Sequence, residues 1–117
     1  MYEVIFTEQF RSDIRFYVKK RHFRHIEEDI RPVLEELQRG NLLGDEIPNM
    51  NVNKEGHTYK VRAANTDTKA GKSNGYRIIY YVIKDDKEIY LLTIYHKKDD
   101  IRVPSNAELK ELVEKYC

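Results

Sequence analysis

The chain has almost no cysteine and no long apolar run, and both shortages narrow what it can be. Cys117, at the very end of the 117 residues, is the only cysteine, so neither a disulfide framework nor a cysteine metal cluster can be built. No apolar run approaches the ~18 residues that a membrane span needs, and the first residues lack the apolar core of a secretory signal. We therefore expect a cytoplasmic protein with no membrane partner.

The sequence also lacks the usual motifs of metal-binding and nucleotide-binding sites. Four scattered histidines form no HExxH pair, and two of them lie in the charged run 19–25, KKRHFRH, which we expect to be solvated surface. The segment 70–75, AGKSNG, resembles a phosphate loop, but Thr66 stands where its first glycine would be and a strand follows it. No Ser-His-Asp or Cys-His arrangement is visible. We expect no metal and no cofactor.

What the chain does contain is charge, unevenly placed. Charged residues make up 35% and hydrophobic residues 40%, a composition that suits one folded domain over residues 1–117. The net charge of +1 hides an asymmetry, because residues 57–98 hold nine Lys and Arg against four Asp and Glu, whereas 1–56 and 99–117 are each net −2. A concentrated positive region favours a polyanionic partner such as nucleic acid.

Hydrophobic periodicity predicts two helices in the first half of the chain. A short strand at 2–6 is followed by Thr7, a plausible N-cap, and by apolar residues at helical spacing up to Val18. A second helix carries an apolar stripe and ends near Gly40, a natural C-cap. Pro32 lies inside this pattern, so we expect either a kink or a later start.

The second half of the chain is predicted to form an antiparallel meander. Strands are expected at 58–64, 76–83 and 88–95, and the middle one is apolar on both faces and therefore central. Residues 41–57 read as a long connection, and a Ser-x-x-Glu capping box at 105–108 begins a short C-terminal helix. The expected fold class is α+β, with N-terminal helices packed on a small antiparallel sheet and a short C-terminal helix.

Basic side chains gather on this meander. Lys60 and Arg62 alternate along the first strand and so share one face, and Arg77 begins the next strand. The last strand ends in Tyr95, His96, Lys97 and Lys98. Because the end of one strand and the start of its neighbour meet at the same edge of a meander, we expect these side chains to converge on an anionic ligand.

Such a pocket has the chemistry to cleave RNA without a metal. A base deprotonates the 2′-hydroxyl, a cation stabilises the charged phosphorane, and an acid protonates the leaving 5′-oxygen. Lysine, histidine and tyrosine can carry protons when their surroundings shift their pKa, and arginine suits bidentate phosphate contact. The alternative is that Lys60 and Arg62 are solvent-facing sheet residues and that His96 is an ordinary surface histidine. The other tyrosines of the meander are expected to pack in the core.

Four segments of the chain resemble the RelE/ParE superfamily of bacterial type II toxins, and within it the RelE- and HigB-like branch. They are LEELQRGNLLGDEI at 34–47, YKVR at 59–62, GKSNGYRIIYYV at 71–82 and IYLLTIYHKKD at 89–99. The resemblance implies a RelE-like fold and a toxin that cleaves mRNA in the ribosomal A site until an antitoxin binds it. Its implied partners are the ribosome, mRNA and a cognate antitoxin, expected to be of helix-turn-helix type.

The resemblance also implies roles for individual residues. It assigns Arg62 and Arg77 to the scissile phosphate, leaves proton transfer to Lys60, Tyr95 or His96, and assigns RNA contacts to Lys72, Lys97 and Lys98. Base and acid stay unassigned. Two alternatives remain open, a ParE-like toxin that poisons DNA gyrase and an inactive homologue that only binds its antitoxin. The antitoxin is expected to lie across the sheet or to displace the C-terminal helix.

Overall fold

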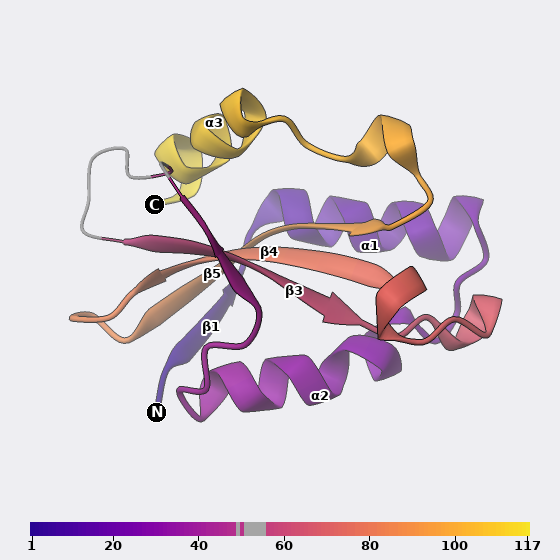
Figure 1. Ribbon diagram of the computed structural model, residues 1–117, viewed down its shortest axis with the longest axis horizontal. Helices are drawn as coiled ribbons and strands as arrows, with labels where there is room; N and C mark the ends of the chain where they lie inside the picture. Colours follow the sequence, from indigo (N-terminus) through magenta and orange to yellow (C-terminus); the bar gives the residue numbers. More distant parts are fainter. Residues whose placement is uncertain (49, 51–55) are drawn as a thin grey trace.

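The computed structural model describes residues 1–48, 50 and 56–117, which form three layers around one sheet. The strands are β1 (Glu3–Phe6), β2 (Asp45–Ile47), β3 (His57–Ala63), β4 (Tyr76–Ile83) and β5 (Glu88–His96). The helices are α1 (Glu8–Lys20), α2 (Ile26–Gln38) and α3 (Asn106–Tyr116), with short 3-10 turns η1 (Thr66–Thr68), η2 (Lys72–Asn74) and η3 (Asp100–Arg102). Figure 1 shows α2 and α3 on opposite sides of the sheet. The α+β fold with a short C-terminal helix is confirmed.

The sheet runs in the order β1-β5-β4-β3-β2, and its centre is the predicted meander. β3, β4 and β5 pair antiparallel, but β1 lies parallel to β5, so the sheet is mixed rather than wholly antiparallel. β2 pairs antiparallel with β3 and lies inside the stretch 41–57 that was expected to be a connection. Positions 49 and 51–55 of that stretch lie outside the described residues.

Helix α1 is capped by Thr7 and also forms hydrogen bonds with the edge of β5. Thr7 caps it as predicted, because its hydroxyl accepts the Phe10 N–H at 3.2 Å. Beyond the end of β1, α1 also satisfies the free edge of β5: a carboxylate oxygen of Asp13 accepts the Ile94 N–H at 3.2 Å, and the Tyr17 hydroxyl accepts the His96 N–H at 2.7 Å. The C-terminal end of β5 is therefore fixed by side chains of α1 on the side where β1 has ended, while its other side pairs with β4.

Helix α2 begins at Ile26 and passes through Pro32, so the alternative of a later start is wrong. A proline inside a helix removes one backbone hydrogen bond and costs about 3 kcal/mol. Burial of the apolar stripe formed by Ile26, Ile30 and Leu37 against the sheet offsets that cost.

The central strand β4 is buried along its whole length, as predicted. Its alternate residues serve two separate cores. Tyr76, Ile78, Tyr80 and Val82 pack with α1 and α2, whereas Ile79, Tyr81 and Ile83 pack with Leu109 and Val113 of α3. The predicted capping box that starts α3 is present. No helix among the described residues is long and apolar enough to cross a membrane.

Candidate RNA-binding groove

Strand register places three of the predicted site residues in one row across the sheet. Arg62 of β3 lies opposite Arg77 of β4, and Arg77 lies opposite Tyr95 of β5. Lys60 is two residues from Arg62 and therefore shares its face. This face is the one that α3 covers elsewhere, since Tyr95 packs in the cluster formed with that helix.

The row borders an open groove with a volume of about 740 Å³. Its lining residues are Val33, Leu43, Gly44, Asp45, Lys60, Val61, Arg62, Lys72, Arg77, Tyr95, Lys97 and Val103. Five of these are cationic and one, Asp45, is acidic. Within the described part of the chain, none of the five cations makes a salt bridge with a carboxylate. The groove therefore has uncompensated positive charge available to an anion.

The buried side chain of Arg77 fixes the turn that borders the groove. Its side chain is only 6% exposed and donates three hydrogen bonds to backbone carbonyls, to Lys72 at 3.1 Å, Tyr76 at 3.2 Å and Ser73 at 2.8 Å. These bonds hold η2, which carries Lys72. Burial, together with the neighbouring charge of Arg62, lowers the pKa of Arg77, although a guanidinium stays protonated in proteins. An anion bound between the two arginines would relieve their repulsion.

Tyr95 is suited to donate a proton rather than to accept one. Its side chain is 5% exposed, and burial raises the pKa of its phenol while the charge of Arg77 opposes that shift. The hydroxyl is therefore protonated at neutral pH. The sequence did not decide which residue is the general acid and which the general base, and Tyr95 fits the role of the acid better.

His96 does not reach the groove. It is 6% exposed and lies on the opposite face of β5, with its ring 5.5 Å from the Phe23 ring and 5.9 Å from the Tyr76 ring. Asn65 Nδ2 lies 3.3 Å from its Nδ1, and burial lowers the pKa of the imidazole. The sequence could have predicted this separation, because Tyr95 and His96 are consecutive strand residues and must point to opposite faces.

The lysines after β5 divide in the same way. Lys97 lines the groove, and its N–H donates to the Gly75 carbonyl at 2.9 Å, whereas Lys98 is exposed and outside the lining. Gly75 is needed here, because a Cβ on it would lie 2.1 Å from the Ala63 carbonyl oxygen. Gly44, at φ +95°, likewise lets its segment approach the Lys60 carbonyl oxygen, where a Cβ would lie 2.3 Å away. Sequence reasoning identified neither glycine.

Sequence reasoning also missed the pair that supports the end of β5. Asp13 is 2% exposed, and its carboxylate accepts a hydrogen bond from Arg102 Nη2 at 2.9 Å besides the one from Ile94. The Arg102 guanidinium lies 3.9 Å from the centre of the Phe16 ring. The available signal was the position of Asp13 among the apolar residues of α1, where a lone carboxylate indicates a buried partner.

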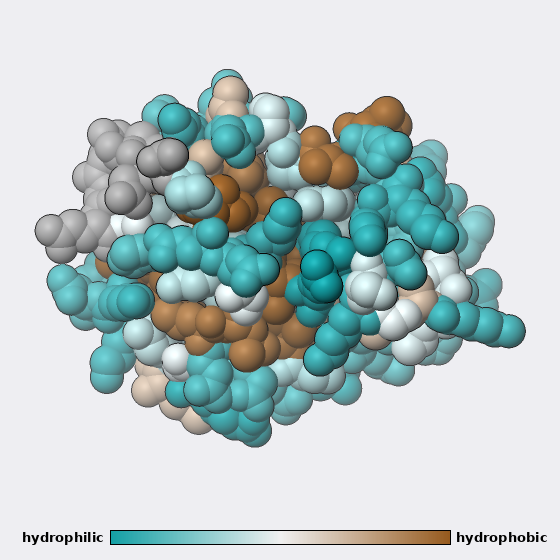
Figure 2. Space-filling model, in the orientation of Figure 1, coloured by the Kyte–Doolittle hydropathy of each residue, from teal (hydrophilic) through white to brown (hydrophobic). Residues whose placement is uncertain are grey.

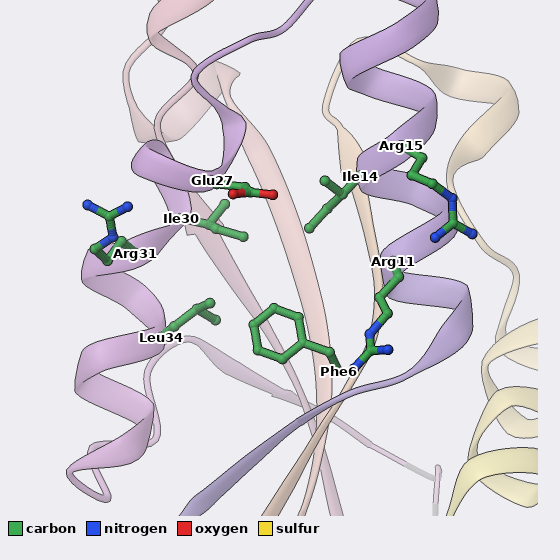
Figure 3. Close-up of a pocket in the computed structure, with 8 residues that line it drawn as sticks. All are labelled: Phe6, Arg11, Ile14, Arg15, Glu27, Ile30, Arg31 and Leu34. Carbon is green, nitrogen blue, oxygen red and sulfur yellow. The ribbon is translucent and has the colours of Figure 1, made fainter.

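A second cavity, of about 430 Å³, lies between α1 and α2. Figure 3 shows Phe6, Ile14, Ile30 and Leu34 around an apolar cleft and Arg11, Arg15, Glu27 and Arg31 at its rim. None of the predicted site residues lines it, and it offers no pair of groups for proton transfer. Among the described residues there is also no cluster of three His, Cys, Asp or Glu side chains that could hold a metal ion.

Comparison with known proteins agrees with this fold. Among solved structures, the isolated RelE toxin of E. coli matches over 100% of both chains with a TM-score of 0.54 and 16% sequence identity, which supports a shared fold. None of the curated proteins matches. A family model described as "ParE toxin of type II toxin-antitoxin system, parDE" matches residues 4–101, a span that contains every groove residue except Val103. The chain therefore belongs to the ParE toxin family, within the RelE/ParE superfamily of type II toxin–antitoxin toxins.

Proposed function

We propose that the chain is a ribosome-dependent mRNA endoribonuclease that acts without a metal and inhibits translation in the cytoplasm. The observation that carries this proposal is the row Arg62, Arg77 and Tyr95, which lines one groove together with Lys60 and Lys72. Attack by a neighbouring 2′-hydroxyl requires cations that stabilise the charged phosphate and an acid that protonates the leaving oxygen. The two arginines can supply the cations, and the protonated phenol of Tyr95 can supply the acid. The RelE-like fold supports the same reading.

In the proposed reaction each group has one task. Arg62, which is exposed, binds the nonbridging oxygens of the scissile phosphate, and buried Arg77 adds a fixed positive field beneath it. Lys60, on the same face, is the candidate base for the 2′-hydroxyl. The deprotonated 2′-oxygen attacks the phosphorus to form a pentavalent phosphorane. The phosphorane collapses to a 2′,3′-cyclic phosphate as the 5′-oxygen leaves with a proton from Tyr95.

Dependence on the ribosome follows from the openness of the groove. The lining holds five cations around a volume of about 740 Å³, and among the described lining residues Tyr95 is the only aromatic ring on which a base could stack. A single RNA strand would bind there in many orientations. We propose that the ribosome supplies the missing order by presenting mRNA in its A site, because correct placement of reacting groups is a large share of catalysis.

As a type II toxin the chain has a cognate antitoxin, for which we propose the helix-turn-helix type. We propose that an antitoxin segment neutralises the groove by lying across the sheet or by displacing α3. The ring of Tyr95 packs in one cluster with Leu109 and Val113 of α3, so removal of that helix would also disturb the proposed acid. A complex that leaves both the groove and α3 untouched would contradict this mode of neutralisation.

The match to ParE toxins favours a second candidate function, inhibition of DNA gyrase. Purified protein added to a translating extract, with mapping of mRNA ends, separates the two. We expect cuts within codons at the A site that disappear in Arg62→Ala and Arg77→Ala and persist in Lys84→Ala, an exposed cation in the β4–β5 turn. Intact mRNA together with inhibited supercoiling would favour the gyrase function. Intact mRNA with normal supercoiling would favour a homologue that only binds its antitoxin.

A further inference from the structure

The last part of β5 has no strand on one of its sides. β1 pairs with β5 only as far as Leu91. Beyond that point, the Ile94 N–H donates to the Asp13 carboxylate at 3.2 Å. Two residues later, the His96 N–H donates to the Tyr17 hydroxyl at 2.7 Å. Four residues of a helix advance about 6 Å and two residues of a strand advance about 6.8 Å, so successive turns of α1 match successive free N–H groups of β5.

The Tyr17 hydroxyl forms two hydrogen bonds. Besides accepting the His96 N–H, it donates to Asp99 Oδ2 at 2.8 Å. Asp99 also contacts Arg21 at 2.9 Å, and its own N–H donates to the His96 carbonyl at 2.9 Å. Burial raises the pKa of the Tyr17 phenol, so it keeps the proton that it donates. One hydroxyl therefore connects α1, the last residue of β5 and the turn that follows.

The ring of Tyr17 is held in place by packing. It is fully buried, stacks on Phe23 at 5.7 Å between ring centres, and meets the edge of Tyr76 at 5.8 Å. Figure 1 shows α1 and β5 ending at the same side of the molecule, and Figure 2 shows mostly hydrophilic side chains there. The end of β5 is thus fixed by a polar contact beneath the surface and not by an apolar cover outside it.

This contact acts on the strand that carries Tyr95. The two residues held by α1, Ile94 and His96, are its direct neighbours in the chain. On the other side of the strand, Tyr95 pairs with Arg77 of β4. The lining of the groove does not include Tyr17. Any influence of Tyr17 on the groove therefore passes through the backbone of β5.

We propose that Tyr17 is a positioning residue for Tyr95, because its hydroxyl holds the end of β5 where the Tyr95 phenol can reach the leaving 5′-oxygen. The inference rests on the proposed mRNA cleavage and adds to it a residue outside the groove. A general acid has to stand about 2.6–3.2 Å from the atom that it protonates. A displacement of about 1 Å can lower the rate about 100-fold, and a strand end paired on one side only is free to move by that much once the hydroxyl is removed.

The test compares two variants that each lose one buried phenol hydroxyl and keep the ring. Tyr17→Phe removes the contact with β5. Tyr76→Phe is the matched control, because Tyr76 packs in the same cluster and its hydroxyl has no hydrogen-bond partner among the described residues. Cleavage is measured on mRNA-programmed ribosomes at a temperature where each protein is folded. We expect kcat to fall about 10- to 100-fold in Tyr17→Phe with KM within about threefold, and both values to stay within about twofold of wild type in Tyr76→Phe.

The Tyr95→Phe background separates positioning from a general effect on the fold. Without the Tyr95 hydroxyl there is no acid to place, so Tyr17→Phe should lower the remaining kcat by less than about twofold. A loss by the same factor in both backgrounds would overturn the inference, since Tyr17 would then act independently of Tyr95. Equal kcat values for Tyr17→Phe and Tyr76→Phe would overturn it as well.

A measurement without ribosomes keeps this inference distinct from the proposed function. NMR of protein labelled with 13C-tyrosine follows the Tyr95 ring, and hydrogen exchange follows the His96 amide. We expect the Tyr95 signal to shift in Tyr17→Phe but not in Tyr76→Phe, and the His96 amide to exchange about tenfold faster or more in Tyr17→Phe alone. An unchanged Tyr95 signal in Tyr17→Phe would refute the positioning role. If wild type cuts no mRNA while both expected changes are seen, the proposed function fails and the placement of Tyr95 by Tyr17 stands.

Discussion

Two neighbouring residues, Tyr95 and His96, show how strand alternation separates chemistry from packing. Burial raises the pKa of Tyr95 and lowers the pKa of His96, so both side chains are neutral near pH 7. Tyr95 borders the groove beside Arg77, whereas His96 packs among aromatic rings on the other face. We therefore keep Tyr95 as the proposed acid and treat His96 as a core residue.

The stability cost of His96→Gln should shrink as the pH falls. The folded state lowers the pKa of His96, mainly by burial and with Lys98, Arg21 and Arg77 acting in the same direction against Asp99. Below the ordinary pKa of about 6.5 the unfolded chain binds the proton more readily, so wild type loses stability as the pH falls and the non-titrating Gln does not. Urea unfolding of both proteins at about pH 8 and about pH 5 measures the difference.

A cost that stays constant or grows towards low pH would contradict this assignment. The same variant should retain mRNA cleavage at neutral pH, because His96 lies away from the groove. Loss of cleavage in a variant that is still folded would return His96 to the list of candidate proton carriers.

At the scale of elements, close backbone approaches hold the groove in shape. Gly75 joins the end of β3 to the residue after β5, where a Cβ would lie 2.1 Å from the Ala63 carbonyl oxygen. Arg77 holds the preceding turn η2 through backbone carbonyls. The positions of Lys72 and Lys97 therefore depend on contacts between backbones and not only on side chains.

Gly75→Ala should disturb the groove, and Gly71→Ala in the same loop provides its control. A Cβ at Gly71 meets nothing within 4 Å, so that substitution should be neutral or stabilise the protein by up to about 1 kcal/mol. Gly75→Ala has to push backbone apart and should lower the free energy of unfolding by about 1–3 kcal/mol, with loss of cleavage. Chemical denaturation and the extract assay measure both effects. Similar results for the two variants would show that the approach at Gly75 is unimportant.

Local signals account for the elements that the sequence predicted. The apolar run of β4 and the Ser-x-x-Glu box of α3 are visible within a few residues, and both are confirmed. β2 was missed because Asp45–Ile47 has no apolar alternation and is a strand only through its pairing with β3. The row Arg62, Arg77 and Tyr95 was foreseeable from alternation along a meander. The part of the groove lined by Gly44 and Val103 could not be predicted, since it forms only when segments distant in the sequence meet.

Across the whole molecule the two faces of the sheet are covered unequally. α1 and α2 together cover one face with a single large cluster. On the other face α3 buries Leu109 and Val113 against a smaller cluster, and the row Arg62, Arg77 and Tyr95 lies on the part that α3 leaves uncovered. The face that carries the proposed chemistry is thus the one with the lighter cover.

Hydrogen exchange should rank these parts by stability. All eight residues of β4 are buried, so their amides should exchange only when the whole protein unfolds. Amides in α3 should exchange through a local opening that costs at least about 2 kcal/mol less, because that helix is anchored by few buried side chains. Native-state exchange at increasing denaturant measures both. If α3 proves as protected as β4, its displacement by an antitoxin becomes an unfavourable route.

The strand order has a consequence for the newly made chain. β1 pairs with β5, which contributes Tyr95 and follows β2, β3 and β4 in the chain. The intervening strands cannot complete the sheet in the meantime, because β5 lies between β1 and all of them. The groove is lined by residues from Val33 to Val103, so it cannot form until β5 and the segment after it have left the ribosome that makes the chain. A nascent toxin therefore carries no assembled site until all of β5 has been made and released.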